Sequence, residues 1–201
     1  MKLTICITAC FLTLLCTQGA NAQQLGPTSF KTVVVETVLP FSVRAYQPTF
    51  ILPEVKRTLG GNFLAPEDAI SAFFGSLRAA DYQWNETTWT RFSREFNSRK
   101  NAESGLIAKD WEARWSKQFS DKKIELLSRI DYDKYVILEY QATVASTGQI
   151  TETDTLVLER EGDSWLLTQA LVDNPITFAW KTSGKRLQLG PNTVGRLAKK
   201  P

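Results

Sequence analysis

The stretch LVLEREGDSWLLTQA, residues 156–170, contains two runs of alternating residues that meet at Gly162 and Asp163. Glycine at the first position of a two-residue connection favours a type II′ turn and therefore a β-hairpin. Pairing across this turn sets Leu158 opposite Leu167. The stretch thus predicts two antiparallel strands with one apolar face.

The residues before this hairpin extend the sheet. Residues 136–144 and 150–160 also alternate, and Ser146-Thr147-Gly148 separates them. A turn centred on Thr147 sets Tyr140 opposite Asp154. If the strand after Gly162 runs to residue 173, the registers from the two turns agree on the residues of the buried face. These are Val136, Leu138, Tyr140, Leu156, Leu158, Leu167 and Leu171.

Further strands are predicted on either side of these two hairpins. In the strand after Asp121, one face is expected to hold Ile124, Leu126, Ile130 and Tyr132. A further hairpin over residues 176–189 would turn at Ser183-Gly184. Near the N-terminus, residues 30–43 include the β-branched run Thr32 to Val35, a strand candidate that Pro40 would end.

The middle of the chain follows a helical period instead. Residues 65–80 begin with Pro66, Glu67 and Asp68, which suit a helix N-terminus. One face of this helix holds Ala69, Ile70, Phe73, Phe74 and Leu77. Two further helical stretches are marked by Trp84, Trp89, Phe92 and Phe96, and by Ile107, Trp111, Trp115 and Phe119. Helices followed by antiparallel strands predict an α+β fold.

This order of elements resembles the nuclear transport factor 2-like superfamily. The likeness lies in PEDAISAFF at residues 66–74, RAADY at 78–82 and the hairpin LEREGDSWLL at 158–167. It implies a cystatin-like cone over residues 65–180, in which N-terminal helices pack in the concave face of a curved antiparallel sheet. Some members use the pocket of the cone for isomerisation or dehydration, and many use it as a binding or assembly surface.

The predicted registers also yield one polar constellation. Asp154 would lie on the apolar face between Tyr140 and Leu171, with Glu152 and Asp173 one step away. A desolvated carboxyl group beside a tyrosine hydroxyl can serve as general acid or base, so Asp154 and Tyr140 are the candidate catalytic pair. The alternatives are a solvated rim of acids or, less favoured, a calcium site. The expected ligand-binding residues are Trp111, Trp115, Tyr132 and Gln169.

The first 22 residues have the pattern of a secretory signal. Lys2 precedes an apolar run, and Ala20-Asn21-Ala22 predicts cleavage before Gln23. We therefore expect a periplasmic or secreted protein with no transmembrane segment after cleavage. Residues 23–64 would form an N-terminal extension with a strand.

Composition narrows the chemistry. All three cysteines lie inside the signal and the chain has no histidine, so the usual nucleophilic triads and zinc sites are excluded, and no cofactor or metal is expected. The formal net charge of +3 is too small to indicate nucleic acid. Residues 181–201 form a basic tail with six Lys or Arg and no acid, which suits an acidic partner, an anionic membrane surface or simply a solvated terminus.

Two classes of function follow from these observations. The favoured hypothesis is a non-enzymatic binding or assembly module of the bacterial cell envelope, which engages a protein partner or a small apolar ligand. The alternative is a small lyase, hydratase or isomerase that uses Asp154 as base and Tyr140 as hydrogen-bond donor. An envelope-assembly subunit that forms a homodimer through the outer sheet face is a third expectation.

Overall fold

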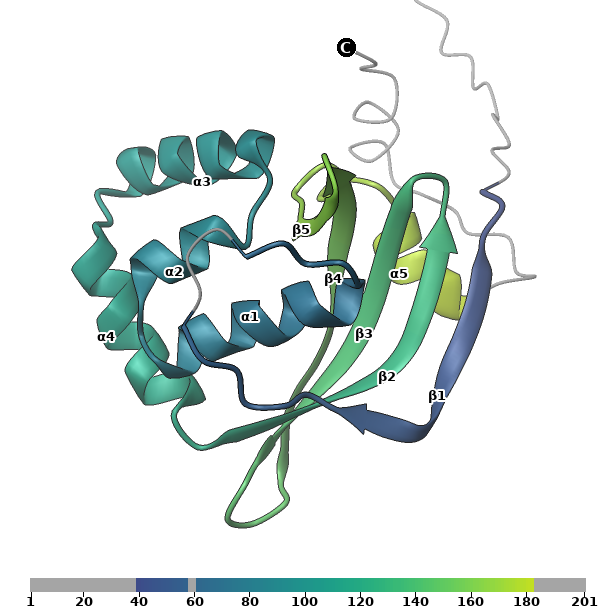
Figure 1. Cartoon of the computed structure of the whole chain (residues 1–201), viewed down its shortest axis with the longest axis horizontal. Helices are drawn as coiled ribbons and strands as arrows, with labels where there is room; N and C mark the ends of the chain where they lie inside the picture. Colours follow the sequence, from purple (N-terminus) through teal and green to yellow (C-terminus); the bar gives the residue numbers. More distant parts are fainter. Residues whose placement is uncertain (1–38, 58–60, 183–201) are drawn as a thin grey trace, which may run out of the picture. The chain divides into compact units, whose positions relative to one another are not determined.

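The structure is a computed structural model that describes residues 39–57 and 61–182. The strands form one antiparallel meander in the order β1-β2-β3-β4-β5 (Figure 1). Their bounds are Ser42–Ile51, Lys122–Tyr132, Tyr135–Val144, Ile150–Glu161 and Ser164–Leu167. The predicted signal, the strand candidate at residues 32–35 and the basic tail beyond residue 182 lie outside the described residues. The first described strand, β1, begins after Pro40.

Both predicted hairpin registers are confirmed. Tyr140 lies opposite Asp154 on β3 and β4, and Leu158 lies opposite Leu167 on β4 and β5. Gly162 has a φ of +64°, the positive value that a type II′ turn requires at its first position.

Four helices precede β2 where the period of the sequence predicts three helical stretches. Helix α1 (Pro66–Arg78) starts with proline and two acids, and the carboxylate of Asp68 accepts the N–H of Ala65 at 3.2 Å. The second predicted stretch is divided into α2 (Tyr82–Thr87) and α3 (Arg91–Ser104), because the side chain of Thr90 caps a new helix. Helix α4 (Ala108–Phe119) completes the layer.

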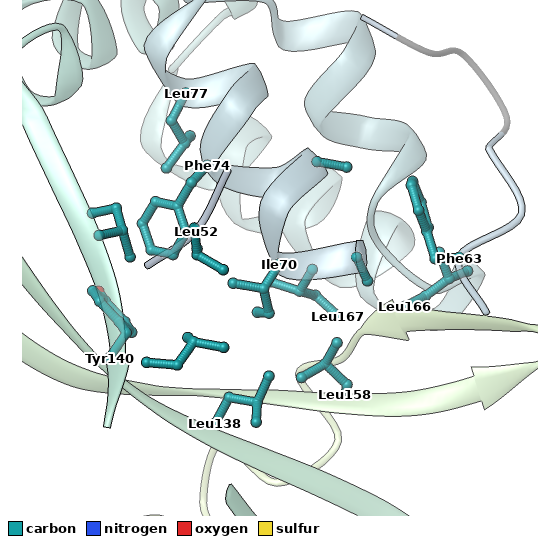
Figure 2. Close-up of a cluster of buried hydrophobic side chains, with 14 of the residues drawn as sticks. Leu52, Phe63, Ile70, Phe74, Leu77, Leu138, Tyr140, Leu158, Leu166 and Leu167 are labelled. Atoms are coloured by element: carbon teal, nitrogen blue, oxygen red, sulfur yellow. The ribbon is translucent and has the colours of Figure 1, made fainter. Parts of the chain in front are cut away.

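The main core lies between α1 and the concave face of the sheet. Figure 2 shows Ile70 and Phe74 of α1 directed toward Leu138 and Leu158, which are fully buried. The ring of Phe74 also meets that of Tyr140 edge-on at 5.0 Å. An α+β fold with helices in the concave face of a curved antiparallel sheet is thereby confirmed.

Strand β2 corrects one prediction. Ile124 and Leu126 belong to the main core, but Ile130 belongs to a second core, against which Tyr132 packs. The register of β2 against β3 shifts by one residue between Leu126 and Ser128. Because side chains alternate along a strand, a one-residue bulge exchanges the faces of all residues after it. The four residues therefore do not share a face.

The C-terminal part of the fold differs more. Strand β5 ends at Leu167 and does not continue to Asp173. The segment that follows leads to helix α5 (Ile176–Ala179) and the 3₁₀ turn η1 (Trp180–Thr182), so residues 176–182 are not the strand of a hairpin. Leu171, expected in the main core, instead packs in the second core together with Ile130, Ile137, Ile176 and Trp180.

Local contacts account for this change of structure. The side chain of Asn174 accepts the N–H of Ile176 at 2.9 Å, and Pro175 stands immediately before α5, where its missing N–H costs nothing. None of the helices in residues 39–57 and 61–182 has both the length and the apolar character needed to cross a membrane.

Candidate functional site

A pocket opens beside β4 where β5 ends. Its volume is about 420 Å³, within the usual range of small-ligand sites. Its lining residues come from β4, from the end of β5 and the segment after it, from α5, and from the link between α2 and α3. They are Trp89, Asp154, Thr155, Leu156, Val157, Leu167, Thr168, Gln169, Leu171, Val172 and Thr177. The pocket therefore occupies the place that a longer β5 would fill.

The wall after β5 is held by hydrogen bonds to the helical layer. The backbone N–H of Gln169 donates to the hydroxyl of Ser93 on α3 at 2.8 Å. The hydroxyl of Thr168 donates to the carboxylate of Glu159 on β4 at 2.7 Å. Ser93 and Thr168 are both buried. The backbone N–H of Thr168 still donates to the carbonyl of Val157 on β4 at 2.8 Å, and the bond from Gln169 to Ser93 then directs the chain away from the sheet.

The floor of the pocket is apolar and aromatic. Trp89 packs edge-on against Phe73 at 5.6 Å, and its indole N–H donates to Asn85 at 3.1 Å. Its orientation is therefore set by two contacts from the helical layer. Leu156 and Leu167 complete this apolar surface.

The rim is polar and acidic. The side chain of Asp154 is exposed, and one of its oxygens accepts the N–H of Thr155 at 2.7 Å. The two walls, residues 150–157 and 168–177, together contain Glu152, Asp154 and Asp173 and no Lys or Arg. Of these acids Asp154 lines the pocket, which thus combines an apolar floor with one carboxylate and suits a ligand with an apolar part and a positive charge.

Tyr140 and Asp154 do not form an acid–base pair. They lie opposite each other in the β3–β4 register, but the hydroxyl of Tyr140 donates to the carboxylate of Glu152 at 2.9 Å. Tyr140 is only 6% exposed and does not line the pocket. Burial, and then the bond to Glu152, raise the pKa of this hydroxyl far above its ordinary value. Asp154 is exposed, so the burial assumed for its role as base is not present.

The four expected ligand-binding residues lie in three different places. Trp115 is buried in the main core and stacks on Tyr82 at 5.9 Å. Trp111 is half-buried, and its indole N–H donates to Asn101 at 3.2 Å. Tyr132 packs against the second core, and Gln169 lines the pocket. Of the six predicted site residues, Asp154 and Gln169 line the pocket, while the rings of Trp111 and Trp115 contact each other at 6.1 Å elsewhere.

Sequence reasoning missed Trp89 and Thr177 as pocket residues. Trp89 was expected on a helical stripe, but it lies in the link between α2 and α3 and forms an isolated bridge with Leu167. No local pattern marks this contact, because the two residues are far apart in the chain. Thr177 was expected in a strand, and it reaches the pocket because residues 176–179 are helical.

A second polar cluster lies at the start of α1. Arg129 of β2 bonds Asp131 at 2.9 Å and approaches Glu67 at 3.7 Å, and Arg44 of β1 bonds Asp131 at 3.0 Å. Burial opposes ionisation of Asp131, but the hydrogen bonds from the two arginines outweigh it and lower its pKa. Since each charge in this cluster has an opposite charge beside it, we assign it to the attachment of α1 to the sheet.

The three acids of the pocket rim do not assemble as a metal site. Within the described part of the chain, no group of three or more Asp, Glu, His or Cys has the arrangement to hold a metal ion. The acidic rim is therefore better suited to an organic cation or a basic side chain than to calcium.

Comparison with known proteins identifies no family for this chain. No protein-family model, no curated protein and no solved structure matches it.

Proposed function

We propose that this chain is an exported, non-enzymatic binding module of the bacterial cell envelope with a nuclear transport factor 2-like fold. The observation that supports a binding role is the pocket beside β4, which joins an apolar floor at Trp89 to an acidic rim at Asp154. The N-terminal signal pattern supports export. The ligand is a protein partner or a small molecule with an apolar part.

The alternative of a lyase, hydratase or isomerase receives no support from the geometry. A general base and a hydrogen-bond donor must both reach the reacting atoms. The hydroxyl of Tyr140 is buried and bonded to Glu152, outside the pocket that Asp154 lines. The two side chains of the candidate pair therefore do not line the same pocket.

Site-specific photocrosslinking tests the binding role. A photoreactive phenylalanine analogue is placed at Val172, which lines the pocket and is 56% exposed, in protein exported by a bacterial host. The matched control places it at Ile107, which is 62% exposed and is not a pocket residue. We expect discrete adducts from position 172 and none from position 107.

Native mass spectrometry of protein purified from the same cells tests whether a small molecule stays bound to it. A single bound mass that is displaced when Val172→Trp fills the pocket would support a small-molecule ligand. Identical adduct patterns at positions 172 and 107, or no adduct and no bound mass, would refute the proposed binding site.

A further inference from the structure

The outer edge of β4 is open next to the pocket. Strand β4 pairs with β3 from Ile150 to Glu159, but its pairing with β5 covers only residues 158–161. Among residues 39–57 and 61–182, no other strand pairs with β4. An unpaired strand edge presents a row of backbone donors and acceptors to which an extended peptide can add.

The backbone groups that face this edge can be assigned from one hydrogen bond. The carbonyl of Val157 accepts the N–H of Thr168 at 2.8 Å, on the side of β5. Successive residues of an antiparallel strand direct their groups alternately to the two sides. Thr155 and Thr153 therefore face the same side as Val157. The N–H of Thr155 is occupied by the carboxylate of Asp154, so the N–H and C=O of Thr153 and the C=O of Thr155 are the groups available to a new strand.

The side chains beside this edge define what such a strand would have to present. Glu152, Asp154 and Leu156 alternate along β4 and project on the same side of the sheet. Residues directly opposite in neighbouring strands have Cβ atoms about 5 Å apart, close enough for ion pairs and apolar contacts. A strand added here would place three alternate residues opposite these three.

We propose that the β4 edge binds an extended peptide segment with an apolar residue followed, at two-residue steps, by two basic residues. The apolar side chain would enter the pocket opposite Leu156 and contact Trp89, and the basic side chains would pair with Asp154 and Glu152. This assignment rests on the proposed binding function and names the chemistry of its partner.

Charge favours a basic partner over a second copy of the chain. Glu152 and Asp154 lie on the side of β4 that the added strand would line, and residues 150–157 contain no Lys or Arg, so these two acids attract an approaching basic side chain. Antiparallel pairing of two β4 edges about Thr153 would set Glu152 of one copy opposite Asp154 of the other. Like charges directly opposite in a sheet are destabilising.

Short peptides test the proposal on the purified protein by isothermal titration calorimetry at low ionic strength. The probe contains the core Leu-Thr-Lys-Thr-Lys, capped at both ends, and the control contains Leu-Thr-Glu-Thr-Glu. We expect the basic peptide to bind at least about tenfold more tightly, because both pairs reverse sign in the control. On binding, the amide of Thr153 should exchange its hydrogen at least about tenfold more slowly, because it becomes bonded to the added strand.

Two substitutions at one position separate strand addition from simple pocket binding. Thr153→Pro removes the outward N–H, while the β3–β4 ladder, which uses the other side of β4, is preserved. We expect it to weaken the basic peptide by about tenfold or more, and we expect Thr153→Ala to bind like the original protein. Circular dichroism reports whether Thr153→Pro folds. If it does not, protection of the Thr153 amide alone tests strand addition, and Asp154→Lys tests the charge pairing: it should abolish the preference between the two peptides, because each then has one attractive and one repulsive pair.

The outcomes distinguish this inference from the proposed function. If the basic peptide binds without protecting the Thr153 amide, and Thr153→Pro binds like Thr153→Ala, strand addition is wrong while the pocket remains a binding site. If no peptide binds but position 172 still yields crosslinked adducts, the partner has another chemistry. If a peptide of residues 183–201 binds more tightly than the basic peptide, the occupant of the β4 edge is the protein's own tail and not another protein. If the protein forms a concentration-dependent dimer that Thr153→Pro abolishes, the occupant is a second copy of the chain.

Discussion

The hydroxyl of Ser93 should stabilise the protein by positioning the wall of the pocket. Ser93 is fully buried on α3, where its oxygen accepts the N–H of Gln169 at 2.8 Å and the hydroxyl of Thr90 at 2.8 Å. The substitution Ser93→Ala removes this acceptor from the N–H of Gln169, which is half-buried, and from the hydroxyl of Thr90, which is buried. An unsatisfied buried donor costs about 1–3 kcal/mol.

The greater helix propensity of alanine offsets about 0.5 kcal/mol of that cost. We therefore expect the free energy of unfolding to fall by about 1–2 kcal/mol. With a urea dependence of about 2 kcal/mol/M, the midpoint of urea unfolding should move down by about 0.5–1 M. The amide of Gln169 should also exchange its hydrogen faster.

Ser98→Ala is the matched control for this experiment. Ser98 lies on the same helix and is exposed, so its substitution changes helix propensity without removing a buried acceptor. Equal urea midpoints for the two variants, together with unchanged protection of the Gln169 amide, would refute the positioning role of Ser93.

Three further predictions concern the core and the leader. Because burial raises the pKa of Tyr140, the stability that this residue contributes is complete below the ordinary tyrosine pKa of about 10 and declines as pH rises above it. Above pH 10 the free energy of unfolding, measured by urea titration, should therefore fall less steeply in Tyr140→Phe than in the original protein, by about 1.4 kcal/mol per pH unit. Gly75→Ala should lower the melting temperature, because a Cβ there would lie 2.8 Å from the ring of Trp84 and 2.9 Å from a methyl of Val55. Such overpacking costs about 1–3 kcal/mol, which exceeds the gain of about 1 kcal/mol from the better helix propensity of alanine. N-terminal sequencing of protein recovered from a bacterial periplasm should begin at Gln23, and an uncleaved chain would contradict the predicted signal.

Turn chemistry made part of the sheet predictable. Gly162 and Gly148 both have positive φ, at the two turns from which the registers were derived. Each turn fixes the pairing of the strands that it joins, because a shift of one residue would expose the apolar face. Pairings such as Tyr140 with Asp154 therefore follow from residues near each other in the sequence, and the structure has them as predicted.

The bulge in β2 could not be predicted in the same way. Residues 124–132 contain no glycine or proline to mark the irregularity between Leu126 and Ser128, and the adjacent Leu126 and Leu127 are a weak signal for it. The switch of faces becomes favourable only because a second apolar layer, with Ile176 and Trp180, exists on the opposite side to receive Ile130. That layer comes from a distant part of the chain.

The candidate site depends on the same kind of distant contact. Extending the register of β5 to residue 173 placed Asp154 opposite Leu171 on a dry face, which made the carboxyl group a candidate base. In the structure β5 ends at Leu167 and the last bond to β4 is made by the N–H of Thr168, because the hydroxyl of Ser93 on α3 provides an alternative partner for the N–H of Gln169. The strand residues that would have covered β4 are thereby removed from its edge. The early end of β5 accordingly has three consequences: it exposes Asp154, opens the pocket, and leaves the backbone of Thr153 accessible to a strand from another molecule.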